Sequence, residues 1–100
     1  MEEYNIRILS SAQIDLLDIV EYLNTLAPEA AEQYYDLLIE RIETLKTSPE
    51  RGSPAKDTQL RLRGYRTLPV NDYFVLFVIR GDVVEIRRVL YAKRQFEWLL

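Results

Sequence analysis

The sequence predicts an α+β fold, in which two helices pack on one face of a small antiparallel sheet of about four strands. In the first half of the chain, apolar residues recur at helical spacing in two successive stretches. In the second half, residues 73–79 are all apolar or aromatic, which is typical of a strand buried on both faces. Residues 83–91 follow a short turn and are the natural partner strand. We expect the 100 residues to form a single domain.

The opening residues predict a short strand and then the first helix. Residues 4–9 alternate between apolar and polar side chains, as a half-buried strand does. Ser10 and Gln13 have the spacing of a capping box, so the helix should begin there and continue to about Leu26. Its expected apolar stripe consists of Ala12, Leu16, Ile19, Val20, Leu23 and Leu26.

A second helix should follow at once. Pro28 fits a first helical turn, and the helical spacing of apolar residues continues to about Thr47. Tyr34 and Tyr35 on this helix are expected to pack in the core, the common position for aromatic side chains. Residues 48–59 contain two prolines and a glycine, and we expect them to form a connecting loop.

The remaining strands carry two irregularities. A strand over residues 65–68 should end at Pro69 or lie at a sheet edge there, because proline cannot donate to a strand ladder. In the last strand, the apolar phase before Ile86 differs from the phase that begins at Val89. A bulge near Arg87–Arg88 would restore the phase and change the direction of both arginines.

Composition excludes several chemistries. The chain has no cysteine and no histidine, which excludes disulfides, zinc–thiolate sites, cysteine nucleophiles and histidine acid–base catalysis. Residues 1–50 have a net charge of −8 and residues 51–100 a net charge of +5. The basic half therefore either faces an anionic partner or pairs with the acidic half.

We expect no metal, no cofactor and no membrane. Asp15 and Asp18 could share a helix face and hold a cation, but two carboxylates supply too few ligands for a hard cation. A solvated helix face is therefore the expected role of the pair. The chain has no apolar run of membrane-spanning length, and its first residues are acidic, unlike an export signal. These observations predict a cytoplasmic protein.

Several short sequence motifs, or phrases, occur together along the chain. They are Ala12, Asp15-Leu16, Asp18-Ile19 and Tyr22-Leu23; Leu45, Pro49 and Gly52; Leu62-Arg63-Gly64-Tyr65-Arg66; and the run from Tyr73 to Arg94. On these phrases the chain resembles the RelE/ParE superfamily, the plasmid-stabilisation toxins of bacterial type II toxin–antitoxin systems. The resemblance implies the order β-α-α-β-β-β and a toxin that is neutralised by a cognate antitoxin protein.

The resemblance leaves three activities open. RelE-like members are similar to ribosome-dependent mRNA endonucleases that need no metal. ParE-like members are similar to proteins that arrest growth by binding DNA gyrase, without chemistry of their own. A third alternative is an inactive toxin that only binds its antitoxin. Whether the chain is an enzyme therefore depends on the branch to which it belongs.

Position by position, the resemblance favours the ParE-like activity. Arg66 and Arg94 match basic catalytic positions of the RelE pattern, and they would be catalytic only if the chain is RelE-like. The other polar positions of that pattern fall on Leu68, on Phe74 and near Leu100, which are apolar. The sequence pI near 5.0 also fits poorly with docking on RNA.

The remaining candidates are residues for binding the target or the antitoxin. They lie in the basic half and at the apolar C-terminus, and they are Arg61, Arg63, Arg87, Arg88, Tyr91, Lys93, Phe96, Trp98, Leu99 and Leu100. Salt bridging and solubility are the alternative roles for the charged members. An antitoxin tail with acidic and apolar residues would match this set.

Overall fold

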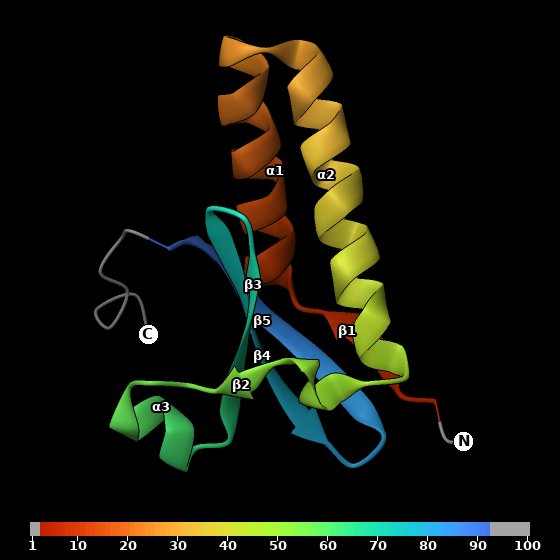
Figure 1. Ribbon diagram of the computed structural model, residues 1–100, viewed down its shortest axis with the longest axis vertical. Coiled ribbons are helices and arrows are strands. Elements are labelled where there is room, and N and C mark those ends of the chain that lie inside the picture. The colour runs from red at the N-terminus through yellow and green to blue at the C-terminus, as the bar shows by residue number, and fades with distance from the viewer. Residues whose placement is uncertain (1–2, 93–100) are drawn as a thin grey trace.

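A helical hairpin and a five-stranded sheet form the two layers of the protein in the computed structural model, which describes residues 3–92 (Figure 1). The helices are α1 (Ser10–Leu26), α2 (Pro28–Glu43) and α3 (Thr58–Leu62), with 3₁₀ turns η1 (Thr44–Lys46) and η2 (Pro49–Arg51). The strands are β1 (Asn5–Ile8), β2 (Ser53–Pro54), β3 (Tyr65–Val70), β4 (Tyr73–Arg80) and β5 (Val83–Tyr91). This architecture confirms the predicted fold class.

The sheet has the strand order β1-β5-β4-β3-β2. Strands β2 to β5 are antiparallel, as expected, but β1 pairs with β5 in parallel, with Asn5 opposite Val83 and Ile8 opposite Ile86. The sheet is therefore mixed, and it has five strands where about four were expected. Local sequence patterns do not report the direction in which an edge strand adds, because that direction depends on pairing between distant residues.

The hairpin agrees with the predicted helix boundaries at most ends. α1 spans the predicted range, and α2 ends at Glu43, after which the 3₁₀ turn η1 continues to Lys46. The capping-box prediction is wrong. Leu9 is the N-cap of α1 and no side chain caps the helix, while Gln13 Nε2 donates to the Ile8 carbonyl at 3.0 Å.

Half of the predicted apolar stripe of α1 is buried, Val20 and Leu23 are partly buried, and Leu26 is exposed. Ala12, Leu16 and Ile19 lie in the core, whereas Leu26 is 65% exposed. The reason is geometric, because the end of the hairpin where α1 meets α2 extends beyond the sheet (Figure 1). No helix in the described range is both long and apolar enough to cross a membrane.

The connecting segment contains more structure than expected. Within residues 48–59, η2 is followed by β2, whose Ser53 and Pro54 pair with Thr67 and Arg66 of β3. Strand β3 continues through Pro69 to Val70 instead of ending at residue 68. Pro69 lies beyond the end of β2, where β3 is an edge, so its missing N–H leaves no ladder bond unmade.

The central strand of the sheet, β4, is buried on both faces. On the helix side, a large cluster joins α1 and α2 to alternate residues of β4, including Val75 and Phe77. On the other side, Phe74 and Leu76 of β4 pack with Leu90 and Tyr65. The prediction that β4 is buried on both faces is therefore confirmed, and β4 is the central strand of the sheet.

The predicted bulge lies in β5. Leu76 of β4 pairs with Arg88 and the next residue, Phe77, pairs with Ile86, so Arg87 has no partner on β4. The bulge moves the apolar residues after it into phase with those before it. The side chains of Arg87 and Arg88 reach different parts of the molecule, Tyr65 and Asp15 respectively.

We predict that Gly52→Ala destabilises the fold. A Cβ at this position would lie 2.5 Å from Cζ of Phe77, a fully buried ring, and 2.9 Å from the carbonyl oxygen of Thr67. Overpacking of this kind lowers the free energy of unfolding by about 1–3 kcal/mol. Urea unfolding would measure the change, with Ser53→Ala, an exposed neighbour, as the control. Equal stability of the two variants would contradict this account of Gly52.

Candidate functional site

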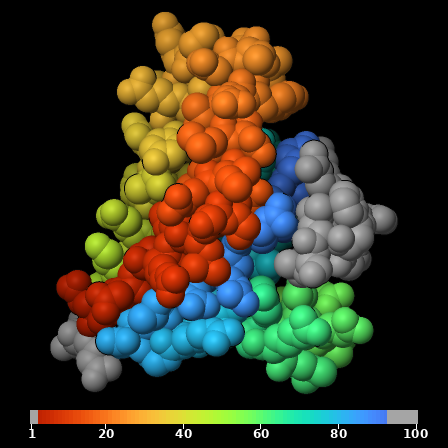
Figure 2. Space-filling view, turned by 180° about the vertical axis from the view of Figure 1, so that it is seen from behind, coloured from red at the N-terminus to blue at the C-terminus, as the bar shows by residue number. Residues whose placement is uncertain are grey.

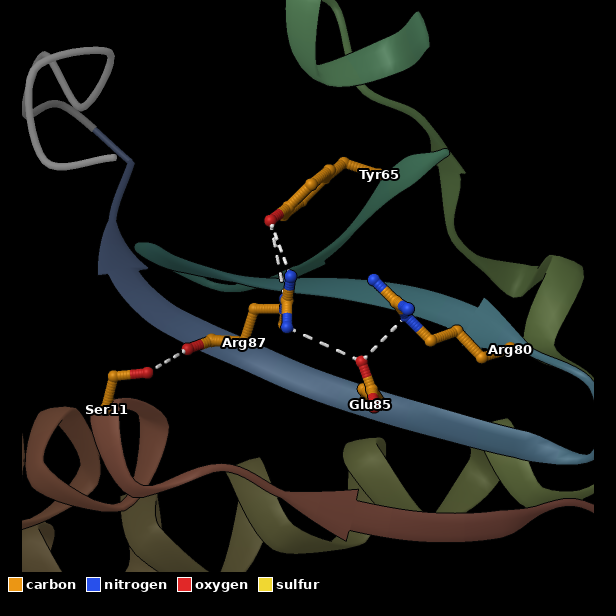
Figure 3. A network of polar contacts seen from close by, with 5 residues as sticks. All are labelled: Ser11, Tyr65, Arg80, Glu85 and Arg87. Atoms are coloured by element: carbon orange, nitrogen blue, oxygen red, sulfur yellow. Dashed lines mark hydrogen bonds and ion pairs between the residues drawn. The ribbon is translucent and has the colours of Figure 1, made fainter. Parts of the chain in front are cut away.

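The sheet face away from α1 and α2 carries a polar network around Arg87 (Figure 3). The guanidinium of Arg87 donates to the Tyr65 hydroxyl from Nε at 3.3 Å and from Nη2 at 3.1 Å. Its carbon Cζ lies 5.5 Å from the centroid of the Tyr65 ring. Glu85 Oε1 accepts from Arg87 at 3.5 Å and pairs with Arg80 Nε at 3.2 Å. This network holds Arg87 over the sheet, with its side chain partly exposed.

A second polar cluster joins α1 to the outer edge of β5. Asp15 accepts two hydrogen bonds from Arg88, at 2.7 Å from Nε and 3.0 Å from Nη2. The same carboxylate accepts a hydrogen bond from the backbone N–H of Val89 at 2.9 Å.

Two further groups bind the backbone of β5. Ser11 Oγ donates to the carbonyl oxygen of Arg87 at 2.7 Å, and the Leu9 N–H donates to the carbonyl oxygen of Ile86 at 3.0 Å. Three groups of α1 and its N-cap therefore satisfy the backbone of β5 beyond the point where β1 ends.

Asp15 was expected to lie on a solvated helix face, but the structure places it in a bidentate ion pair. Side-chain exposure is 12% for Asp15 and 22% for Arg88. The hydrogen bonds from Arg88 to Asp15 raise the pKa of the guanidinium above its ordinary value, so Arg88 stays charged. This is one of three ion pairs among the described residues, and it alone joins the acidic half to the basic half. Pairing between the halves therefore accounts for little of the charge asymmetry.

The other predicted arginines do not converge. Arg66 Nη2 donates to the carbonyl of Gly52, while its Nε is buried without a hydrogen-bond partner among the described residues. Arg61 donates to the carbonyl oxygens of Ala55 and Lys56, which fastens α3 to the preceding loop. Arg63 is exposed, and its side chain makes no hydrogen bond or ion pair within residues 3–92. The basic half thus presents separate cations instead of one cluster.

Tyr91 lies in a pocket between α1, α2 and the adjoining ends of β4 and β5. We call it the tyrosine pocket. Its volume is about 680 Å³, and it is lined by Asp15, Asp18, Ile19, Tyr22, Leu23, Tyr34, Asp72, Tyr73, Arg88, Val89, Leu90 and Tyr91. Helix α1 and strand β5 lie side by side there, as the orange-red and blue surfaces of Figure 2 show.

Three of the four tyrosines in the pocket are in ring contact. Tyr73 meets Tyr34 edge to face at 5.4 Å between centroids, and it meets Tyr91 in the same manner at 5.5 Å. The Tyr34 hydroxyl donates to the Val70 carbonyl at 3.0 Å and accepts from the Asp72 N–H at 3.2 Å. Burial raises the pKa of Tyr34 and the pKa of Tyr73, so both hydroxyls remain neutral at physiological pH.

Sequence reasoning found part of these sites. It identified Arg87 and Tyr91, but it gave no role to Tyr65 or Glu85 in the network and placed Tyr34 only in the core. The spacing of Asp15 and Asp18 on α1 marked Asp15 as a candidate cation ligand, but it did not identify Arg88 as the residue with which Asp15 pairs. Six predicted residues lie outside the described range, namely Lys93, Arg94, Phe96, Trp98, Leu99 and Leu100.

Within residues 3–92 no group of three or more histidine, cysteine, aspartate or glutamate side chains could hold a metal ion.

Comparison with known protein families gives one match over most of the chain. Residues 6–96 match the family described as the ParE toxin of the type II toxin–antitoxin system parDE. Comparison with curated proteins gave no match.

Solved structures with the same fold include two toxin–antitoxin systems. One is the chromosomal ParDE toxin–antitoxin system of P. aeruginosa, with a TM-score of 0.79 and 21% identity. The alignment covers 91% of this chain and 98% of that one. The other is the RelBE2 toxin–antitoxin complex of Mycobacterium tuberculosis, with a TM-score of 0.64 and 24% identity, and the alignment covers 93% of this chain and 97% of that one.

We predict that Asp15→Asn lowers the free energy of unfolding by about 2–3 kcal/mol. The change leaves the Arg88 guanidinium without its counter-ion, and partial exposure to water keeps the loss below that of a fully buried pair. Asp18→Asn is the matched control, because Asp18 is exposed and has no ion pair among the described residues. Its stability should stay within about 0.5 kcal/mol of the unmodified protein in the same urea titration. A loss in Asp15→Asn no larger than in the control would contradict the role given to this ion pair.

Proposed function

The chain belongs to the ParE toxin family of type II toxin–antitoxin systems, and we propose that it arrests growth by binding DNA gyrase and is neutralised by a cognate antitoxin. The competing activity within the superfamily is ribosome-dependent cleavage of mRNA. Because one fold hosts both activities, the choice between them rests on the side chains at the site.

The main support for this proposal is that apolar side chains stand where a ribonuclease of this superfamily needs polar groups. RNA cleavage by 2′-hydroxyl attack requires a base, a proton donor and cations around one phosphate. By the resemblance to the superfamily, Leu68 and Phe74 fall on two of these positions, and each is only 8% exposed. Both residues belong to apolar clusters of the sheet, and neither side chain offers a polar group to a phosphate.

The matching arginine also supports the proposal. The Arg66 guanidinium donates to the Gly52 carbonyl at the β2 side of the sheet. Arg87 lies over the face away from the helices, on Tyr65, and Arg88 is bound to Asp15 on α1. Three cations that point to three places cannot stabilise charge on one phosphate. An acidic protein, with a sequence pI near 5.0, is also poorly suited to the ribosomal surface.

The antitoxin is proposed to contact the face that carries Arg87. Arg63 is exposed and has no ion pair among the described residues, and Arg87 is partly exposed and shares Glu85 with Arg80. An antitoxin segment with acidic and apolar residues would pair with these two arginines. Arg61 and Arg88 serve the fold through their hydrogen bonds, and we propose only a secondary contact role for them. The predicted contacts of Lys93 and the apolar C-terminal residues remain part of the proposal.

The activity is tested by two assays run in parallel with the purified protein. In the first, gyrase supercoils a relaxed plasmid, and we expect a dose-dependent loss of supercoiling. In the second, a cell-free translation mixture contains purified mRNA and no DNA, and primer extension maps the message. Here we expect an intact message and undiminished protein synthesis, because gyrase has no role in that mixture.

Each alternative outcome has a distinct meaning. Ribosome-dependent cleavage of the message would overturn the proposal in favour of the RelE-like activity. Inhibition in neither assay would identify an inactive toxin that only binds its antitoxin. The product of the adjacent gene, added before gyrase, should restore supercoiling if it is the antitoxin.

We predict that the double variant Arg63→Gln/Arg87→Gln binds this antitoxin about tenfold more weakly, because exposed charge pairs contribute up to about 1 kcal/mol each. Arg41→Gln on α2 removes one exposed charge from the helical layer and is the control, which should change the affinity less than twofold. Isothermal titration would measure both, after thermal melting has established that the variants are folded. Equal affinity of the double variant and the control would remove this face from the antitoxin interface.

A further inference from the structure

The tyrosine pocket has a combination of side chains that the proposed function does not use. Four tyrosines contribute to its wall, from α1 (Tyr22), α2 (Tyr34), β4 (Tyr73) and β5 (Tyr91). Its volume of about 680 Å³ falls within the range of small-ligand sites. It is far larger than a free ion needs, so a side chain presented by a polypeptide fits it better.

The pocket is electronegative. Three carboxylates and one guanidinium line it, so its net charge is −2. Arg88 already neutralises Asp15 through two hydrogen bonds. The uncompensated charges are therefore those of Asp18 on α1 and Asp72 in the turn between β3 and β4. Both residues are exposed, and neither side chain has an ion pair within residues 3–92.

The aromatic groups add to this negative potential. The face of a tyrosine ring attracts cations, and arginine in particular stacks on such rings. Tyr22 is 60% exposed and Tyr91 is 38% exposed, so both offer ring surface to a ligand. The ring contacts of Tyr73 with Tyr34 and Tyr91, and the hydrogen bonds of the Tyr34 hydroxyl, hold this side of the pocket in place. The wall is thus preorganised by the fold.

We propose that the tyrosine pocket binds an arginine side chain presented by a partner protein, with its guanidinium between the tyrosine rings and the carboxylates of Asp18 and Asp72. An anionic group would meet two uncompensated carboxylates. A metal ion would find two carboxylates where a hard cation needs at least six oxygen ligands. A planar cation on a flexible apolar stem satisfies both the rings and the charges. The inference goes beyond the proposed function, since it holds whichever protein presents the arginine.

The test is a titration of the ¹⁵N-labelled protein with N-acetyl-L-arginine amide, followed by two-dimensional NMR. N-acetyl-L-citrulline amide is the matched probe, because it has nearly the same shape without the charge. We expect the arginine probe to shift the backbone amides of Ile19, Tyr22, Tyr73 and Tyr91, and to bind about tenfold more tightly than the citrulline probe. Neither gyrase nor an antitoxin is present, so the result is independent of the proposed target.

Two double variants complete the test. Asp18→Asn/Asp72→Asn keeps the shape of the pocket and removes both uncompensated charges, so the preference for the arginine probe should disappear. Asp36→Asn/Glu40→Gln removes two charges from α2 outside the pocket, and the preference should survive. Equal binding of the two probes, amide shifts elsewhere in the protein, no shift with either probe, or equal losses in both double variants would each overturn the proposal.

Discussion

The junction between α1 and the outer edge of β5 is the constraint on which the rest of the structure depends. Strand β1 covers that edge only from Val83 to Ile86. Beyond Ile86 the unpaired backbone of β5 would be exposed, and an exposed sheet edge is a site for unwanted strand pairing. The carboxylate of Asp15 and the hydroxyl of Ser11 bind that backbone in place of a strand. A helix thereby completes the edge that a four-residue strand leaves open.

The same junction gives the two neighbouring arginines different roles. The bulge leaves Arg87 without a partner on β4, and its freed carbonyl oxygen is the group that Ser11 binds. Arg88 fastens the helical layer to the sheet, whereas Arg87 extends over the opposite face to Tyr65. Two neighbouring arginines thus divide the work: Arg88 binds the helical layer, and Arg87 carries its charge over the opposite face of the sheet.

Most of the fold could be predicted from local patterns, and the site only in part. Helical spacing located α1, and the unbroken apolar run located β4, because burial imposes these periods on the sequence. The phase change after Ile86 located the bulge by the same logic. The parallel addition of β1 and the pairing of Asp15 with Arg88 depend on contacts across more than 70 positions, as Asn5 and Val83 illustrate. Such distant contacts leave no periodic pattern in the sequence. The arginines were therefore grouped by their charge alone, although the structure separates them.

The parallel pairing of β1 with β5 has a consequence for how the protein is made. A parallel pair needs a crossover connection, and here the crossover contains both long helices and three strands of the sheet. Closing such a long loop is entropically unfavourable and slows folding, because the hydrogen bonds between β1 and β5 stabilise the chain only after the loop has closed. On the ribosome, β1 and the β5-facing side of α1 must wait for the last strand to be synthesised. A nascent chain therefore lacks its complete sheet until β5 has left the exit tunnel.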